Sequence, residues 1–277
     1  MTNSIESFDC NMIKSMDSLL EDEITIFVEG VTDKDFFEEL FDLNGISKSK
    51  YKIYQARNLE FDTQYLISQG ISLPSGESGK IRLAAELVSP YTERTYFVSD
   101  RDLLNSSDLK ILDGLKWTDF PALESYAFSE DIFDDINEKK FSNLFPHSSH
   151  YFPALTNTLI HCTSIRKNNM DSQKQAVNNF ITSINSLDDL LTFRESIQDI
   201  NENYSLDDIR SEIYGHDITR MFLQVTFEFK RENQHKIGSF NGRVFEYWML
   251  HSYLILRNEN LDPMPKFFVN LLKDFSI

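Results

Sequence analysis

Three carboxylates stand where predicted strands end, and these residues are the best placed in the sequence to do chemistry. Glu29 closes the run ITIFVEG (24–30), whose β-branched and aromatic residues indicate a buried strand. Asp100 and Asp102 close TYFVSDRD (95–102) in the same way, and in an extended chain end they share a face. Parallel α/β sheets bind ligands outside the carboxyl ends of their strands. We therefore expect the three side chains at one rim of a sheet.

Carboxylates gathered in one cleft repel each other, and a divalent cation removes that cost. Oxygen ligands of this kind suit Mg²⁺ or Mn²⁺, which keep several waters and share their remaining positions with substrate phosphates. Two such ions can activate a water and stabilise the leaving oxygen of a phosphodiester. Each motif alone is more often a solvated loop acid. Their placement at successive strand ends is what favours metal-dependent phosphodiester hydrolysis.

Alternating strand and helix signals predict the fold class that positions these acids. Apolar runs at 24–28, 51–55 and 95–100 alternate with helical patterns at 32–44 and 79–89. Strand, helix, strand, helix, strand implies parallel pairing. The class predicted for this part of the chain is therefore α/β with a parallel sheet.

Beyond about residue 121 the strand signals thin out, and the second part is predicted to be mainly α-helical. Apolar residues recur at helical spacing over three segments, 176–197, 216–230 and 245–256. Clusters of Asn, Ser and Asp indicate connections near 142–150, 168–172 and 201–208.

Two local signals concern helix starts. Thr32 is expected to cap the first helix, with Asp35 three residues on as in a capping box. GESGK (76–80) lacks the GxxxxGK[ST] spacing of a phosphate loop, so we expect a turn before the next helix. Any ATP dependence would then come from a partner.

The composition is that of a globular protein, with 277 residues, 41% hydrophobic and 26% charged. No apolar run reaches the roughly 18 residues of a membrane helix, and the first residues lack a signal-peptide pattern. Cys10 and Cys162 have no zinc-binding spacing. We expect a cytoplasmic protein with no membrane partner. The net charge of -17 opposes nucleic-acid binding unless metal ions, a local basic face or a basic partner compensate.

VEGVTDKDFFEELF (28–41), followed by FVSDRD (97–102), resembles the TOPRIM family, whose pattern is a Glu after the first strand and a DxD after the third. The extended form EGxTDxxFF is most similar to the stand-alone OLD-like (overcoming-lysogenization-defect) branch. That branch includes the nuclease (toxin) subunit of PARIS-type antiphage systems, encoded beside ABC-type ATPases. The resemblance implies an N-terminal segment (1–21), a TOPRIM-like Rossmannoid metal-binding domain (22–125) and a mainly helical domain (126–277).

The resemblance also assigns roles to single residues. Glu29 becomes a metal ligand that also serves as general base, and Asp100 and Asp102 become metal ligands. Asp33 matches the extra acid of the OLD-like branch. Glu124, in FPALESY, lies where relatives have an acid opening the next helix. The implied cofactor is Mg²⁺ or Mn²⁺, as one or two ions.

Two further motifs are candidates for substrate contact. In GHDITRMF, His216 or Asp217 could face the metal site or bind a phosphate at the helix N-terminus, or Asp217 could simply cap the helix. Lys230, Arg231 and Lys236 lie among phenylalanines, a pattern that fits nucleic-acid contact or an ordinary core.

The site residues predict a metal-dependent phosphodiesterase acting on nucleic acid, and the resemblance implies an endonuclease for DNA or RNA, including tRNA, that is the effector of an ATPase-coupled antiphage defence system. A topoisomerase or primase would need motifs that we do not find. The alternative is a non-catalytic TOPRIM-fold regulatory or assembly subunit, which the acidic charge favours. The expected partner is an ABC-type ATPase docked on the helical domain, with a homodimer as the released form.

Overall fold

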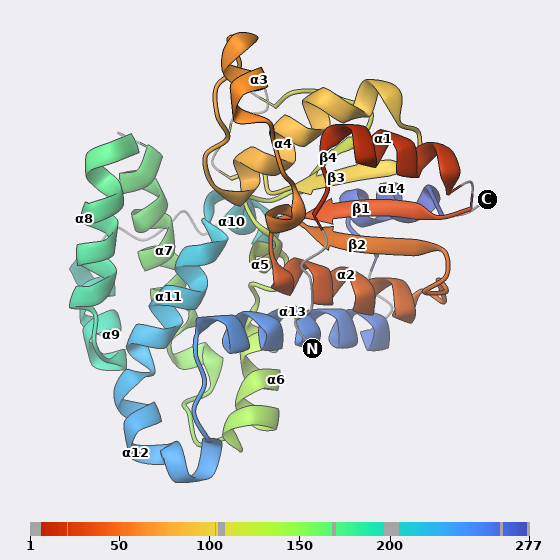
Figure 1. The fold of residues 1–277 in the computed structure, drawn as a ribbon. Helices are drawn as coiled ribbons and strands as arrows, with labels where there is room; N and C mark the ends of the chain where they lie inside the picture. The colour runs from red at the N-terminus through yellow and green to blue at the C-terminus, as the bar shows by residue number, and fades with distance from the viewer. Residues whose placement is uncertain are drawn as a thin grey trace. The chain divides into compact units, whose positions relative to one another are not determined.

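The computed structural model describes residues 7–20, 22–102, 104, 109–167, 170–196, 205–260 and 263–275 (Figure 1). It divides the chain into two compact units: unit 1 is Met1–Arg101, Asn105–Asp119 and Pro263–Ile277, and unit 2 is Asp102–Leu104 and Phe120–Asp262. We expected a separate N-terminal segment and a boundary near residue 125. Unit 1 instead includes the N-terminal helix, ends at Asp119, and resumes at Pro263 with the C-terminal helix of the chain.

Four parallel strands form the sheet of unit 1, in the order β2-β1-β3-β4. They are β1 (Ile24–Val28), β2 (Tyr51–Gln55), β3 (Thr95–Ser99) and β4 (Leu115–Trp117). Ile26 in β1 pairs with Ile53 on one side and Tyr96 on the other. The predicted α/β class with a parallel sheet is confirmed. β4 was not predicted, because it has only three residues and one of them is a lysine.

Helices cover both faces of this sheet (Figure 1). On one face lie α2 (Val31–Leu43) and α14 (Lys266–Lys273), joined by the Phe36 and Phe268 rings at 5.5 Å between centroids. On the other face lie α1 (Cys10–Leu19) and α4 (Gly76–Val88), over a core that includes Phe27 and Phe97. Those two rings stack at 5.3 Å. The short helix α3 (Thr63–Ser68) precedes α4.

Both expectations about helix starts in unit 1 are wrong. Gly30, in extended backbone, is the N-cap of α2, and Thr32 lies inside the first turn. The Gly30 N–H donates to Asp33 Oδ2 at 2.7 Å, so the acid of this capping box is Asp33. GESGK is the first part of α4 itself, not a turn before it. The glycines of GESGK favoured a turn in the prediction. Gly76 does have a φ of +68°, which is typical of turns, but it is the first residue of α4.

Unit 2 is helical, as predicted, and its described residues contain no strand. Its helices are α5 (Leu123–Tyr126), α6 (Glu130–Phe141), α7 (Phe152–Lys167), α8 (Met170–Ser183), α9 (Leu187–Ser196), α10 (Leu206–Glu212), α11 (Gly215–Val225), α12 (Phe227–Ile237) and α13 (Gly242–Asn260). Stacked phenylalanines form its core: the rings of Phe222 in α11 and Phe245 in α13 lie 4.2 Å apart.

Two of the expected connections in unit 2 are helical in part. α8 already begins at Met170, within the expected connection 168–172. Ser205 caps α10 by accepting from the Asp208 N–H at 3.2 Å, because serine and aspartate at this spacing form a capping box. Positions 201–204 lie outside the described residues. Within the described part of the chain, no helix is both long and apolar enough to cross a membrane.

Candidate functional site

Glu29 and Asp100 meet at the carboxyl ends of β1 and β3. The Ser99 hydroxyl donates to Glu29 Oε1 at 2.9 Å, and the Asp100 N–H donates to the same oxygen at 3.1 Å. The chain leaves β1 for β2 on one side and comes back to β3 on the other, so these strand ends flank the switch point where open α/β sheets bind ligands. We call Glu29, Ser99 and Asp100 the carboxyl rim. The rim agrees with the position predicted for Glu29 and Asp100.

Arg82 in α4 contacts the carboxyl rim and, like Ser99, was not predicted as a site residue. Its Nη2 donates to the Asp100 carbonyl oxygen at 3.1 Å, and its Nε donates to the Ser99 hydroxyl at 3.3 Å. The guanidinium lies over the Trp117 ring at 5.0 Å. Arg82 therefore brings a guanidinium group, which is always positively charged, against the carboxyl rim. The only signal for it in the sequence was an arginine in the largely apolar run IRLAAELV, which also contains Glu86.

The predicted ligand Asp33 stands in the first turn of α2, close to the rim in sequence. Its hydrogen bond from the Gly30 N–H gives it a structural role at the helix start. Gly30 directly follows Glu29, so this bond also fixes the backbone where β1 passes into α2. The metal-binding role of Asp33 stays a prediction.

Asp102 belongs to unit 2, and it departs from the extended geometry that we expected. β3 ends at Ser99, and Asp102 adopts a φ of +53°, in the left-handed region. Its N–H donates to the Pro121 carbonyl at 2.9 Å. The extended alternation that was expected to place Asp100 and Asp102 on one face is therefore absent. Aspartate tolerates this backbone conformation better than most residues do.

Glu124 in α5 is a buried acid of unit 2, with 3% of its surface exposed. Its Oε1 lies 3.5 Å from Nδ1 of His216, which opens α11. Its Oε2 is buried with no hydrogen-bond partner among the described residues. Gly215 permits the close approach, because a Cβ there would lie 2.6 Å from the Ala122 Cβ and 2.9 Å from Glu124 Oε2. Sequence reasoning named Glu124 and His216 but did not pair them.

The two members of this pair shift each other's protonation. Burial is the largest single effect on Glu124 and would raise its pKa, but the charge of His216 and the hydrogen bonds to His216 and Glu246 together lower the pKa to about 2. The Glu124 charge raises the pKa of His216 to about 10, against the effect of burial, with Glu246 and Asp102 adding to the rise. A protonated imidazole has no lone pair for a metal. His216 therefore fits the predicted role of a substrate-binding cation.

Asp217 has a role that the sequence alternatives did not include. It is fully buried and forms two hydrogen bonds with Arg166 of α7, from Nε to Oδ2 and from Nη2 to Oδ1, both at 2.7 Å. The Arg166 guanidinium also lies over the Tyr214 ring at 4.9 Å. This buried ion pair joins α7 to the start of α11. It thereby helps to place His216 against Glu124.

The predicted basic patch is only partly assembled. Lys230 and Arg231 line a cavity of about 280 Å³ with Phe227 and Phe240. Lys230 already has a partner within unit 2, because its Nζ donates to the Phe240 carbonyl at 2.9 Å. Partial burial also lowers the pKa of Lys230. Lys236 is not among the residues that line this cavity. Nucleic-acid contact by these three residues stays a prediction.

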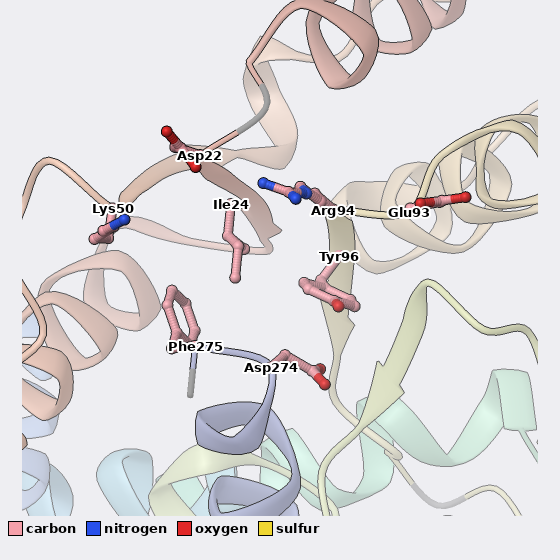
Figure 2. A pocket seen from close by; sticks show the side chains of 8 residues that line it. All are labelled: Asp22, Ile24, Lys50, Glu93, Arg94, Tyr96, Asp274 and Phe275. Carbon is pink, nitrogen blue, oxygen red and sulfur yellow. The ribbon is translucent and has the colours of Figure 1, made fainter. Parts of the chain in front are cut away.

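Unit 1 has a cavity of about 340 Å³ at the amino ends of β1 and β3, away from the carboxyl rim (Figure 2). Lys50 and Arg94 bring positive charge to it, and Asp22 and Asp274 bring negative charge. Burial, and then Asp274, raise the pKa of Tyr96 in its wall to about 12. The mixed charges favour no single ligand class.

Fold and contacts together define an α/β protein with a four-stranded parallel sheet in unit 1 and a helical unit 2, and with acids at the carboxyl ends of its central strands. Neither a protein-family model nor a curated protein matches the chain.

Proposed function

We propose that the chain is a Mg²⁺- or Mn²⁺-dependent nuclease that hydrolyses phosphodiester bonds at the carboxyl rim. One observation carries the proposal: at the switch point of a parallel sheet, Glu29 Oε1 accepts one hydrogen bond from the Asp100 backbone N–H and one from the Ser99 hydroxyl, so the two acidic residues are neighbours there. This is the position where α/β folds bind their ligands. The resemblance of the surrounding motifs to the TOPRIM family gives the same chemistry.

The residues of the rim fit a hard cation. Mg²⁺ is usually bound through one or two carboxylates, keeps several waters and takes further oxygens from substrate phosphates. Among the residues that the structure describes, no three His, Cys, Asp or Glu side chains are placed to hold a metal by themselves. A donor set of two acids suits an ion that the substrate helps to bind. When bound, the ion supplies a Lewis acid and an activated water.

The chain's own groups then have separate tasks in the proposed reaction. Glu29 and Asp100 bind the cation, and Glu29 accepts the proton of the attacking water as general base. Arg82 orients a phosphate oxygen through its guanidinium. The metal-binding role of Asp33 is part of the same proposal, and the metal-binding roles of Asp102 and Glu124 in unit 2 rest on the TOPRIM resemblance. The unpartnered, buried Oε2 of Glu124 is an observation in favour of its role, because a buried carboxylate oxygen needs a partner.

The decisive test is Glu29→Gln. Glutamine keeps the Oε1 acceptor for the Ser99 and Asp100 donors, so we expect the thermal stability to stay within about 2 °C of the wild type. It removes the charge that binds the cation, so Mg²⁺-dependent cleavage should fall at least about 100-fold. Single-stranded DNA, duplex DNA and structured RNA, including tRNA, are assayed in parallel, with the exposed Glu138→Gln as control. Full activity of Glu29→Gln on a substrate that the wild type cleaves would refute the proposal.

The second candidate is a non-catalytic regulatory or assembly subunit, and the net charge of -17 favours it because an acidic surface repels a phosphate backbone. Calorimetric titration with Mg²⁺ and Mn²⁺ separates the two. The nuclease proposal expects binding that is weakened in Asp100→Asn and in Asp102→Asn. Absence of metal binding and of cleavage would leave the scaffold function.

We also propose that an ABC-type ATPase partner controls the nuclease as part of an antiphage defence system. Its supports are the resemblance to ATPase-coupled effectors and the acidic charge, which opposes unaided capture of nucleic acid. Docking on unit 2 and release as a homodimer belong to the same proposal. Co-purification with an ATPase encoded beside the gene, with and without phage infection, tests it. A monomer that cleaves at full rate alone and never binds such a partner would contradict it.

A further inference from the structure

A groove of about 590 Å³ lies between α1, α3 and α4 of unit 1. It uses the C-terminal end of α4, whereas the carboxyl rim uses the N-terminal half of that helix. Leu66 is buried in its wall, while Tyr65 and Tyr91 remain 54% and 68% exposed. Exposed rings beside a concave, partly apolar surface are features of protein docking sites. We call this surface the acidic groove.

Four acids surround the acidic groove, and they differ in how far they are neutralised. Asp9 and Asp62 are the N-caps of α1 and α3, and each accepts from two backbone N–H groups. Glu86 pairs with Lys110 at 2.6 Å. The exposed side chain of Glu60 has no partner among the described residues. A cation entering the groove would therefore meet an uncompensated carboxylate at Glu60.

The groove already contains one example of a cation on an aromatic ring. Lys14, the single basic residue of its lining, places its Nζ 4.0 Å from the centre of the Tyr91 ring. Cations bind to the faces of aromatic rings, and the aliphatic stems of lysine and arginine cover apolar surface. Tyr65, on the neighbouring helix, offers a ring of the same kind beside the acids.

We propose that the acidic groove binds a basic segment of a partner protein, in which lysine or arginine alternates with aliphatic residues. Charge complementarity selects this occupant, because the uncompensated Glu60 carboxylate, beside the carboxylates of Asp9 and Asp62, repels nucleic acid and anionic lipid surfaces. This site lies on unit 1 and does not depend on the nuclease activity.

The test uses synthetic 12-residue peptides in a fluorescence anisotropy titration of the full chain. One set alternates Lys or Arg with Leu, Val or Ile, and the matched sets replace the aliphatic residues by Ser or the basic residues by Glu. We expect the basic-aliphatic peptides to bind most tightly. Glu60→Lys and Tyr65→Ser should each weaken this binding at least about tenfold. The controls at exposed positions of unit 2 are Glu138→Lys, which makes the same charge change, and Phe227→Ser, which likewise replaces an aromatic residue by serine; both should leave it unchanged.

Three results would overturn the proposal. The first is that no basic-aliphatic peptide binds. The second is that Glu60→Lys and Glu138→Lys weaken binding equally, which would indicate general attraction to an acidic chain. The third is that Glu60→Lys dissociates a self-associated wild type in sedimentation while the peptides do not compete, because the occupant would then be a second copy. The readout is binding, so failure here is distinct from failure of the nuclease assay.

Discussion

Removing the charge of Asp217 should lower the free energy of unfolding by more than any substitution of a surface residue. Asp217→Asn keeps the size of the side chain but leaves the Arg166 guanidinium, which is only 11% exposed, without its counter-ion. Two hydrogen bonds of 2.7 Å hold this pair, and Asp217 is fully buried. Breaking a buried ion pair by removing one partner costs about 3–5 kcal/mol, because the remaining charge stays buried and uncompensated. Most of that cost should appear in Asp217→Asn.

The assay is urea unfolding followed by circular dichroism, with Arg166→Met and the double variant completing a thermodynamic cycle. Each single variant should lose about 3 kcal/mol or more of unfolding free energy. The double variant should be less destabilised than the sum by about 2 kcal/mol, because it leaves neither member of the Arg166–Asp217 pair buried and unpaired, and Arg220, which also lies 3.7 Å from Asp217, is 41% exposed to solvent. The exposed pair of Arg231 and Glu228, at 3.8 Å, is the matched control and should show a coupling below about 1 kcal/mol. Additive single effects, or a cost below about 1 kcal/mol for Asp217→Asn, would refute this reasoning.

His216→Gln should show a pH-dependent loss of stability, measured by urea titration in EDTA. Because the pKa of His216 is raised, its contribution is complete below pH 6.5 and disappears as pH rises towards about 10. Because the pKa of Glu124 is lowered, its contribution is complete above pH 4.5 and disappears as pH falls towards about 2. The loss of unfolding free energy in His216→Gln should thus be largest between about pH 4.5 and pH 6.5. It should be about 1 kcal/mol there, because half of the His216 side chain is exposed to solvent. A loss independent of pH would contradict the pairing. Gly215→Ala should lower the free energy of unfolding by about 1–3 kcal/mol, because the new Cβ would overlap with α5. Gly242→Ala, whose Cβ would have its nearest contacts at 3.3 Å, should cost less in the same unfolding assay. Equal costs would show that the close approach at Gly215 is not needed.

The local elements of unit 1 were largely predictable from the sequence. Short runs of β-branched and aromatic residues predicted the exact bounds of β1 and β2, because the side chains of a buried strand are themselves apolar. The meeting of Glu29 and Asp100 was predictable too. Parallel connectivity alone brings the carboxyl ends of adjacent strands to one edge, however long the chain between them.

The return of α14 to unit 1, the left-handed backbone at Asp102 and the contacts of Arg82 had no such signal. Each of them depends on which surfaces pack together after the helices have formed. The same is true of Asp217, whose partner Arg166 stands 51 residues away on another helix. Hydrophobic periodicity tells which face of a helix is buried, but not which helix covers it. Local sequence therefore determined the strands and the rim that they share, and tertiary packing decided which charges of unit 2 are paired, because an ion pair needs a partner brought close from elsewhere in the chain.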